Sequence, residues 1–271
     1  MRKMAAVLSA LALVGSLAAC GDKTDGSASS GNGTEAANNL VALAKSVGDQ
    51  TSEESTAHMV FTGGVGEMQI NGEGDIKIGG TNPAIMMDMD TGQGSMSMVL
   101  LDGVLYFKLP QGLQPSTKPW IKIDPNDKSN PMAAALGGIT DQMRKNADPR
   151  QALEQFQEAG QITSEKKEDL NGVPTTHYAI TVDVEKLAAS QEDPTLKQAM
   201  QDAIKAGLKD FPVDLWVDEK GLPMRMTVEM PTADPTSGKT IPVKVQVDYS
   251  DWGVPVDIQA PPPAQVGEFP N

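Results

Sequence analysis

The residue types that most often carry catalysis are scarce in this chain of 271 residues, which has one cysteine and two histidines. His177 alternates with an apolar position, so we expect it at the surface, on the water-facing side of a strand. No Gly-x-Ser-x-Gly turn, which a serine hydrolase would need, occurs in the chain. Asp88 and Asp90 alternate with Met87 and Met89, which indicates a solvated strand face rather than a glycosidase pair. The sequence therefore predicts no enzyme and no cofactor.

Methionine is the unusual component of the sequence, with 15 residues against 5 Phe, 3 Trp and 3 Tyr. Several methionines are spaced two apart, as in Met87 and Met89, Met96 and Met98, and Met224 and Met226. Thioethers at this spacing could bind Cu(I), but such sites normally include histidine or cysteine, and neither stands in these runs. We therefore expect no metal site.

A wall of methionines suits a different task, because the side chain is flexible and polarisable and adapts to variable apolar shapes such as acyl chains. We predict that one face of the strands lines an apolar ligand cavity. The predicted lining residues are Met87, Met89, Met96, Met98, Leu100, Ile180, Val182, Met224, Met226, Val228, Val245 and Val247. The alternative is that these side chains only fill a core between a sheet and its helices.

The elements that must position these residues are strands, because apolar residues recur with a period of two from residue 57 onward. The clearest runs are 85–89, 96–100, 178–184, 224–230 and 243–249. Tight hairpin turns are predicted at Asn71-Gly72, Asp102-Gly103 and Asn171-Gly172, and a longer loop at 218–221. We expect about nine to eleven strands, mostly antiparallel.

Helical patterns occupy residues 35–47, 131–146, 149–159 and 194–208. A twisted sheet as wide as the one predicted is expected to curl, with the helices covering its concave side. The predicted fold class is therefore α+β, a curved antiparallel half-barrel with helices packed on the concave face. The proline-rich end, residues 260–271, is expected to be extended and peripheral.

The single cysteine, Cys20, ends a short apolar stretch that follows two basic residues. The stretch is too short for a permanent transmembrane helix, so we interpret residues 1–19 as an export signal. Residues 17–20, Leu-Ala-Ala-Cys, resemble the lipobox of bacterial lipoproteins, in which the thiol carries a diacylglycerol. The alternative is an ordinary secretory signal with an incidental cysteine.

These features predict a lipid anchor at Cys20, a flexible Gly/Ser-rich tether over 20–34, a folded domain over 35–263 and a tail over 264–271. The expected location is the extracytoplasmic face of the cell membrane. The formal charge of -14 becomes -16 without Arg2 and Lys3, which opposes binding to nucleic acid and favours a monomer.

Four motifs in order along the chain carry a family resemblance. They are KPWIKID at 118–124, NGVPTTHY at 171–178, LWVD with GLP at 215–223, and DYSDWGVPV at 248–256. Together they resemble the LppX/LprAFG family of actinobacterial cell-envelope lipoproteins, over residues 35 to 263. The resemblance implies a half-barrel similar to the LolA and LolB carriers, with an apolar cavity that receives acyl chains.

We therefore expect a noncatalytic lipoprotein that binds acyl chains of a lipid or glycolipid for transport or presentation in the cell envelope. The alternative is an envelope interaction or stress-sensing module with a packed or vestigial cavity. That module would bind an envelope protein partner through its acidic convex face.

Overall fold

A computed structural model describes residues 33–65, 68–78, 83–90, 92, 94–110, 112, 117–124, 153–154, 156–191, 194–233 and 240–268. All of them belong to one compact unit, Asn32–Asn271. Cys20, the predicted export signal and the predicted helix at 131–146 lie outside the described residues.

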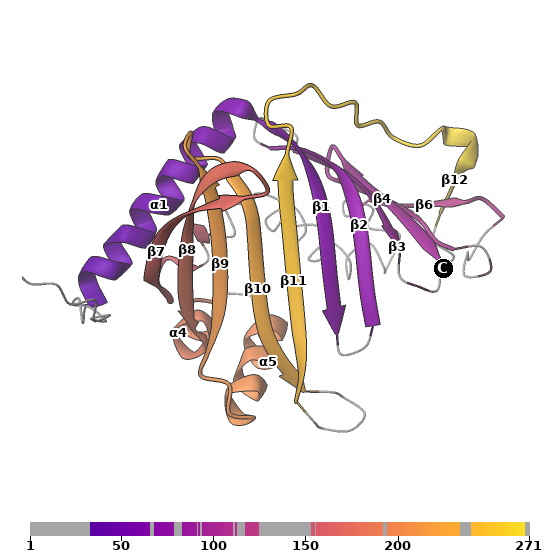
Figure 1. Cartoon of the computed structure of the whole chain (residues 1–271). Coiled ribbons are helices and arrows are strands. Elements are labelled where there is room, and N and C mark those ends of the chain that lie inside the picture. Colours follow the sequence, from indigo (N-terminus) through magenta and orange to yellow (C-terminus); the bar gives the residue numbers. More distant parts are fainter. Residues whose placement is uncertain are drawn as a thin grey trace, which may run out of the picture. The chain divides into compact units, whose positions relative to one another are not determined.

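Twelve strands form one mixed sheet in the order β12-β6-β5-β4-β3-β2-β1-β11-β10-β9-β8-β7 (Figure 1). Every neighbouring pair is antiparallel except β12 with β6, which is parallel. The strands are β1 Thr56–Val65, β2 Met68–Lys77, β3 Ala84–Asp90, β4 Ser95–Leu101, β5 Val104–Lys108, β6 Trp120–Ile123, β7 Gly160–Leu170, β8 Val173–Asp183, β9 Asp210–Asp218, β10 Pro223–Ala233, β11 Thr240–Ser250 and β12 Val266–Glu268. The described part is thus mostly β with a few helices, which is consistent with the predicted α+β class. The twelve strands form one large sheet that is not curled, so the predicted half-barrel is not confirmed.

Two of the predicted hairpin turns are confirmed. Asp102-Gly103 joins β4 to β5 and Asn171-Gly172 joins β7 to β8, and all four residues have positive φ, as a type I′ turn needs. The predicted loop at 218–221 joins β9 to β10, where the Asp218 carboxylate accepts hydrogen bonds from the backbone of Lys220 and Leu222.

The predicted turn at Asn71-Gly72 is wrong, because both residues lie inside β2. Gly72 pairs with Phe61 of β1 and with Met89 of β3. A β-carbon on Gly72 would lie 2.9 Å from the carbonyl oxygen of Asp88, so the glycine serves a close approach between strands. The local Asn-Gly signal does not distinguish this role from a turn.

The first helix, α1 (Gly33–Glu54), is longer than the predicted 35–47. Its buried residues Leu40, Leu43, Ala44 and Val47 follow the spacing of one helix face. The helix stops where Ser55 takes φ 61° and its N–H bonds to the Thr51 carbonyl.

Helix α5 (Pro194–Lys205) lies within the range predicted for it. Helix α4 (Val184–Ser190) was not predicted, and Val184 was instead assigned to a strand. The carboxylate of Asp183 caps α4 by accepting a 3.0 Å hydrogen bond from the Lys186 N–H, which satisfies a donor of the first turn. The apolar residues Val184, Leu187 and Ala188 of α4 are buried.

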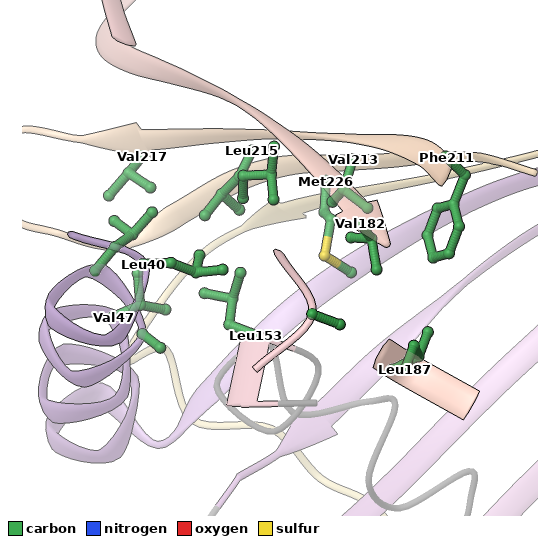
Figure 2. Packing of buried hydrophobic residues seen from close by; sticks show 14 of the residues in the cluster. Leu40, Val47, Leu153, Val182, Leu187, Phe211, Val213, Leu215, Val217 and Met226 are labelled. Carbon is green, nitrogen blue, oxygen red and sulfur yellow. The ribbon is translucent and has the colours of Figure 1, made fainter. Parts of the chain in front are cut away.

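The buried apolar residues form two separate clusters. The first joins α1 and α4 to β8, β9 and β10 and includes Leu153 (Figure 2). The second joins β1 to β6 and β11 and, within the described part, contains only strand and loop residues. Helices therefore cover the part of the described sheet that contains β8, β9 and β10.

The proline-rich end was expected to be extended and peripheral, but it adds structure to the sheet. A 3-10 turn, η1 (Pro263–Gln265), leads into β12, which pairs with β6 along Trp120, Ile121 and Lys122. The sheet consequently has one strand more than the largest number predicted.

Candidate ligand-binding face

Strand register places nearly all the predicted lining residues on one side of the sheet, here called the inner face, which is the side on which α1 packs. Met87 stands opposite Met98, and Met89 opposite Met96. On the other half of the sheet Met226 stands opposite Val247, and Val228 opposite both Val245 and Val213. The remaining inward residues of the predicted set are Leu100, Ile180 and Val182.

Met224 is the exception. It lies where the register between β9 and β10 shifts, between Pro223 and Arg225. It belongs to neither buried cluster. A bulge of this kind breaks the strict alternation from which an inward side chain is predicted.

Burial divides the predicted residues between the two clusters. Ile180, Val182, Met226 and Val228 contact the first, whereas Met87, Met89, Met98, Leu100 and Val247 contact the second. Met98 is 3% exposed and Met226 8% exposed, so both are packed in cores. Met96 and Val245 belong to neither cluster.

A less buried strip lies on the inner face across β1, β10 and β11. We call it the central strip, and it consists of Phe61, Val228, Met230, Val243 and Val245. Met230 is 38% exposed and the other four are half-buried. The ring of Phe61 lies over Gly63, where an added β-carbon would come within 2.7 Å of it. The strip is therefore apolar surface that the described chain covers only in part.

The central strip offers no polar chemistry, because every inward side chain of β1, β10 and β11 at its positions is apolar. The charged residues of these strands point to the opposite side, the outer face, where they are paired. Lys244 bonds Glu229 at 2.8 Å, Arg225 bonds Asp248 at 2.5 Å, and His58 lies 2.9 Å from Asp75. These five side chains offer water no hydrogen bond, so an alkyl chain would replace water there favourably.

His177 was predicted at the surface on the water-facing side of a strand, and the structure confirms the side but shows a less exposed residue. It faces the outer side as expected, but its side chain is only 22% exposed and lies 2.7 Å from the Asp214 carboxylate. Its ring stacks on Trp216 at 4.2 Å, and the Trp216 indole donates a 2.7 Å hydrogen bond to Glu168. Alternation along one strand could not reveal this network, because its members come from β7, β8 and β9.

Glu168 is electrostatically distinct within this network. The hydrogen bond from Trp216 lowers the pKa of the Glu168 carboxyl from its ordinary value, and the bond from Lys166 adds to the effect. Within the described ranges, no three His, Cys, Asp or Glu side chains gather where they could hold a metal ion.

Two cavities lie away from the central strip. One, of about 630 Å³, is at the edge of the sheet near Glu168, Thr175 and Asp218. The other, of about 350 Å³, lies between the C-terminal segment and the strands β3, β4 and β6. Among the helices that the structure describes, none is long and apolar enough to cross a membrane.

Comparison with known proteins gives one relative by sequence. No family model matches the chain. An uncharacterized 31.2 kDa protein of the rplA-rplJ intergenic region of Streptomyces griseus is 28% identical over 185 residues. The chain is a distant homologue of this Streptomyces protein. The match covers 66% of the chain but only 58% of the relative, so it spans less than two thirds of that protein.

Solved structures give weak similarities. A DUF1329 family protein from Desulfovibrio piger is 12% identical, with a TM-score of 0.33 over 82% of this chain and 95% of its own. A porin-like protein from Bacteroides uniformis is 5% identical, with a TM-score of 0.23 over 73% of this chain and 96% of its own. Similarity at these scores assigns no function.

Proposed function

We propose that the protein is a membrane-anchored extracytoplasmic lipoprotein that binds acyl chains of a lipid or glycolipid. The central strip is the observation that supports this proposal most directly. It is an apolar surface on β1, β10 and β11 that remains partly exposed and has no charged side chain at its inward positions. Contiguous exposed apolar surface of this kind commonly marks a ligand or partner site.

The energetics of acyl burial are sufficient for carriage. A chain of about 16 carbons gains roughly 0.8 kcal/mol for each methylene that it buries, so headgroup contacts can be few and exchangeable. Methionines elsewhere on the inner face, such as Met89 of β3 and Met96 of β4, can adjust to chains of different shape. This flexibility favours a carrier that accepts related lipids.

Further features of the sequence support the proposal. The lipobox-like run ending at Cys20 would anchor the chain, and the Gly/Ser-rich tether would let the domain reach the membrane surface. The four motifs that resemble the LppX/LprAFG family support a half-barrel whose cavity takes acyl chains for transport or presentation.

A second candidate function is an envelope interaction module that works through the outer face. The observation that favours it is the ordered polar network of Glu168, His177, Asp214 and Trp216. Such a module would need no bound lipid.

Native mass spectrometry of the Cys20→Ser protein, which lacks the acyl anchor and is purified from its own host without a tag or detergent, tests the two functions. Lipid that accompanies the protein and dissociates on collisional activation would support the carrier. If the protein carries no lipid and does not bind a fluorescent fatty acid added to the solution, the carrier is rejected in favour of the interaction module.

A further inference from the structure

The C-terminal residues 253–266, here called the strap, are fastened at both ends across part of the sheet. At one end the Gly253 N–H bonds to the Thr56 carbonyl at 3.0 Å, and the Thr56 hydroxyl bonds to the Val254 carbonyl at 2.9 Å. At the other end Lys118 donates a 2.8 Å bond to the Val266 carbonyl as β12 joins β6. The strand order places β2 to β5 between these ends (Figure 1).

The middle of the strap rests on the sheet without hydrogen bonds to it. Within the described chain, residues 255–261 make no hydrogen bond to a strand, and Gln259 donates its side-chain bonds to Asp257 of the strap itself. Pro261 is buried, whereas its neighbours Ala260 and Pro262 are exposed. The strap is thus held by its ends, by the buried Pro261 and by the half-buried Val256 and Ile258.

A cavity of about 350 Å³ lies under this part of the strap, on the outer face of the sheet. Met86 and Val99 form its floor, where they stand opposite each other on β3 and β4. Trp120 of β6 and Pro261 of the strap add further apolar walls. The volume is near the lower end of small-molecule sites, and it suits a ligand built on a single ring.

The cavity has few polar groups, and the charged residue among those that line it is Asp88. Asp88 accepts a 2.5 Å hydrogen bond from the Ser97 hydroxyl on one carboxylate oxygen, and its other oxygen has no hydrogen bond from the described part of the chain. The Trp120 indole has no hydrogen-bond partner among the described residues. The chain carries a net charge of -14, so its field attracts cations and repels anions.

We propose that this cavity, the strap site, binds a small organic cation, which is an amine or ammonium group carried on an apolar or aromatic body. The ammonium group would bond Asp88, and the body would lie against Trp120 and Pro261. Tryptophan and carboxylate together are a favourable pair for such cations, because the ring face and the carboxylate both attract positive charge. The bound cation contacts strap and sheet together, so it fastens the strap.

The probe is benzylammonium, titrated by calorimetry into the full chain in micelles, with protein-free micelles as the blank. Neutral benzyl alcohol and anionic benzoate are the comparison ligands. We expect saturable binding of benzylammonium, weaker binding of benzyl alcohol and none of benzoate. The absence of saturable benzylammonium binding would overturn the proposal.

Variants locate the binding. Asp88→Asn should weaken benzylammonium binding by about three- to fivefold, the range expected for one exposed charge pair. Asp90→Asn is the matched control, because Asp90 is also exposed on β3 but does not line the cavity, and its binding should equal wild type. Trp120→Leu should weaken binding by at least about threefold, because it removes the aromatic face. Equal binding of the cation and the alcohol, unchanged in Asp88→Asn, would show an unspecific apolar crevice and reject the proposal.

The strap site and the central strip are on opposite faces of the sheet, so the two proposals can fail separately. Asp88→Asn should retain as much copurifying lipid as wild type. If Asp88→Asn loses cation binding but keeps a normal lipid content, the result concerns the strap site and leaves the acyl-chain proposal unaffected.

Discussion

Gly74 of β2 lies against the backbone of Met86 in β3 so closely that a β-carbon at Gly74 would collide with the Met86 carbonyl oxygen. The same β-carbon would lie 2.8 Å from the Cα of Met87. Neither obstacle is the end of a flexible side chain, so the strands themselves would have to separate. The glycine therefore fixes how closely β2 and β3 approach in the middle of the second apolar cluster.

We predict that Gly74→Ala lowers the free energy of unfolding by about 1–3 kcal/mol, as overpacking against an unyielding neighbour does. Urea unfolding followed by circular dichroism measures the change. Gly63→Ala is the comparison variant, because its added carbon meets the ring of Phe61, which can move aside. An unfolding midpoint for Gly74→Ala equal to wild type would contradict the expected clash.

A charge placed in the central strip should abolish lipid binding if the strip receives acyl chains. Val245→Lys inserts an ammonium group where an alkyl chain would lie, and burial of an unpaired charge is costly. Val60→Lys is the matched control, because Val60 is a 41% exposed valine on the outer face of the neighbouring strand.

Copurifying lipid, extracted and quantified per mole of protein, is the measurement for this pair. We expect Val245→Lys to lose most of the lipid and Val60→Lys to keep it, with both variants folded by circular dichroism. Equal lipid content in the two variants would place the ligand elsewhere.

The lowered pKa of Glu168 predicts a pH dependence of stability. A carboxyl whose folded pKa lies below its unfolded pKa stabilises the fold fully above the unfolded value, near pH 4.5, and this contribution is lost as the pH falls through the folded value. The melting temperature of the wild type should therefore fall on acidification below about pH 4.5. The melting temperature of the Glu168→Gln variant should fall less over the same pH interval.

Melting temperatures from pH 7 to pH 2 test this difference, with Glu165→Gln of the same strand as the control. Trp216→Phe should behave like Glu168→Gln, because the Trp216 hydrogen bond is the largest cause of the shift. Parallel curves for wild type and Glu168→Gln would show that the network does not contribute to acid sensitivity.

Acylation of Cys20 is the simplest of the predictions to check. Cys20→Ser should release the protein from the membrane or block its processing, since no other membrane anchor is predicted in the chain. Metabolic labelling with a radioactive fatty acid should mark wild type and not the variant. Unlabelled wild-type protein in the membrane fraction would overturn the predicted lipid anchor.

The strands were predictable from the sequence because their alternation is local. The runs 85–89, 96–100, 224–230 and 243–249 all lie in strands, and their inward residues share one face, apart from Met224 at its bulge. The run 178–184 is a strand only as far as Asp183, where the side chain caps a helix instead. Local pattern gave no measure of how far each inward residue is buried.

Features that depend on distant parts of the chain could not be predicted in this way. The pairing of β12 with β6 joins residues that lie more than a hundred positions apart, and nothing in the composition of either segment specifies a parallel partner. The contact of His177 with Asp214 likewise depends on the register between β8 and β9. Asn71-Gly72 is the opposite case. The dipeptide is a strong local signal for a turn, but it lies inside β2, where the glycine permits the close approach of β3.

The two outermost strands affect how copies of the protein would meet one another. At one border of the sheet β12 has only three residues, and at the other β7 exposes the run Ser164–Asp169, which is almost entirely charged. Short or charged borders resist backbone pairing with a second chain, which is the usual route to aggregation of β proteins. Copies crowded side by side would thus remain separate molecules instead of merging into one extended sheet.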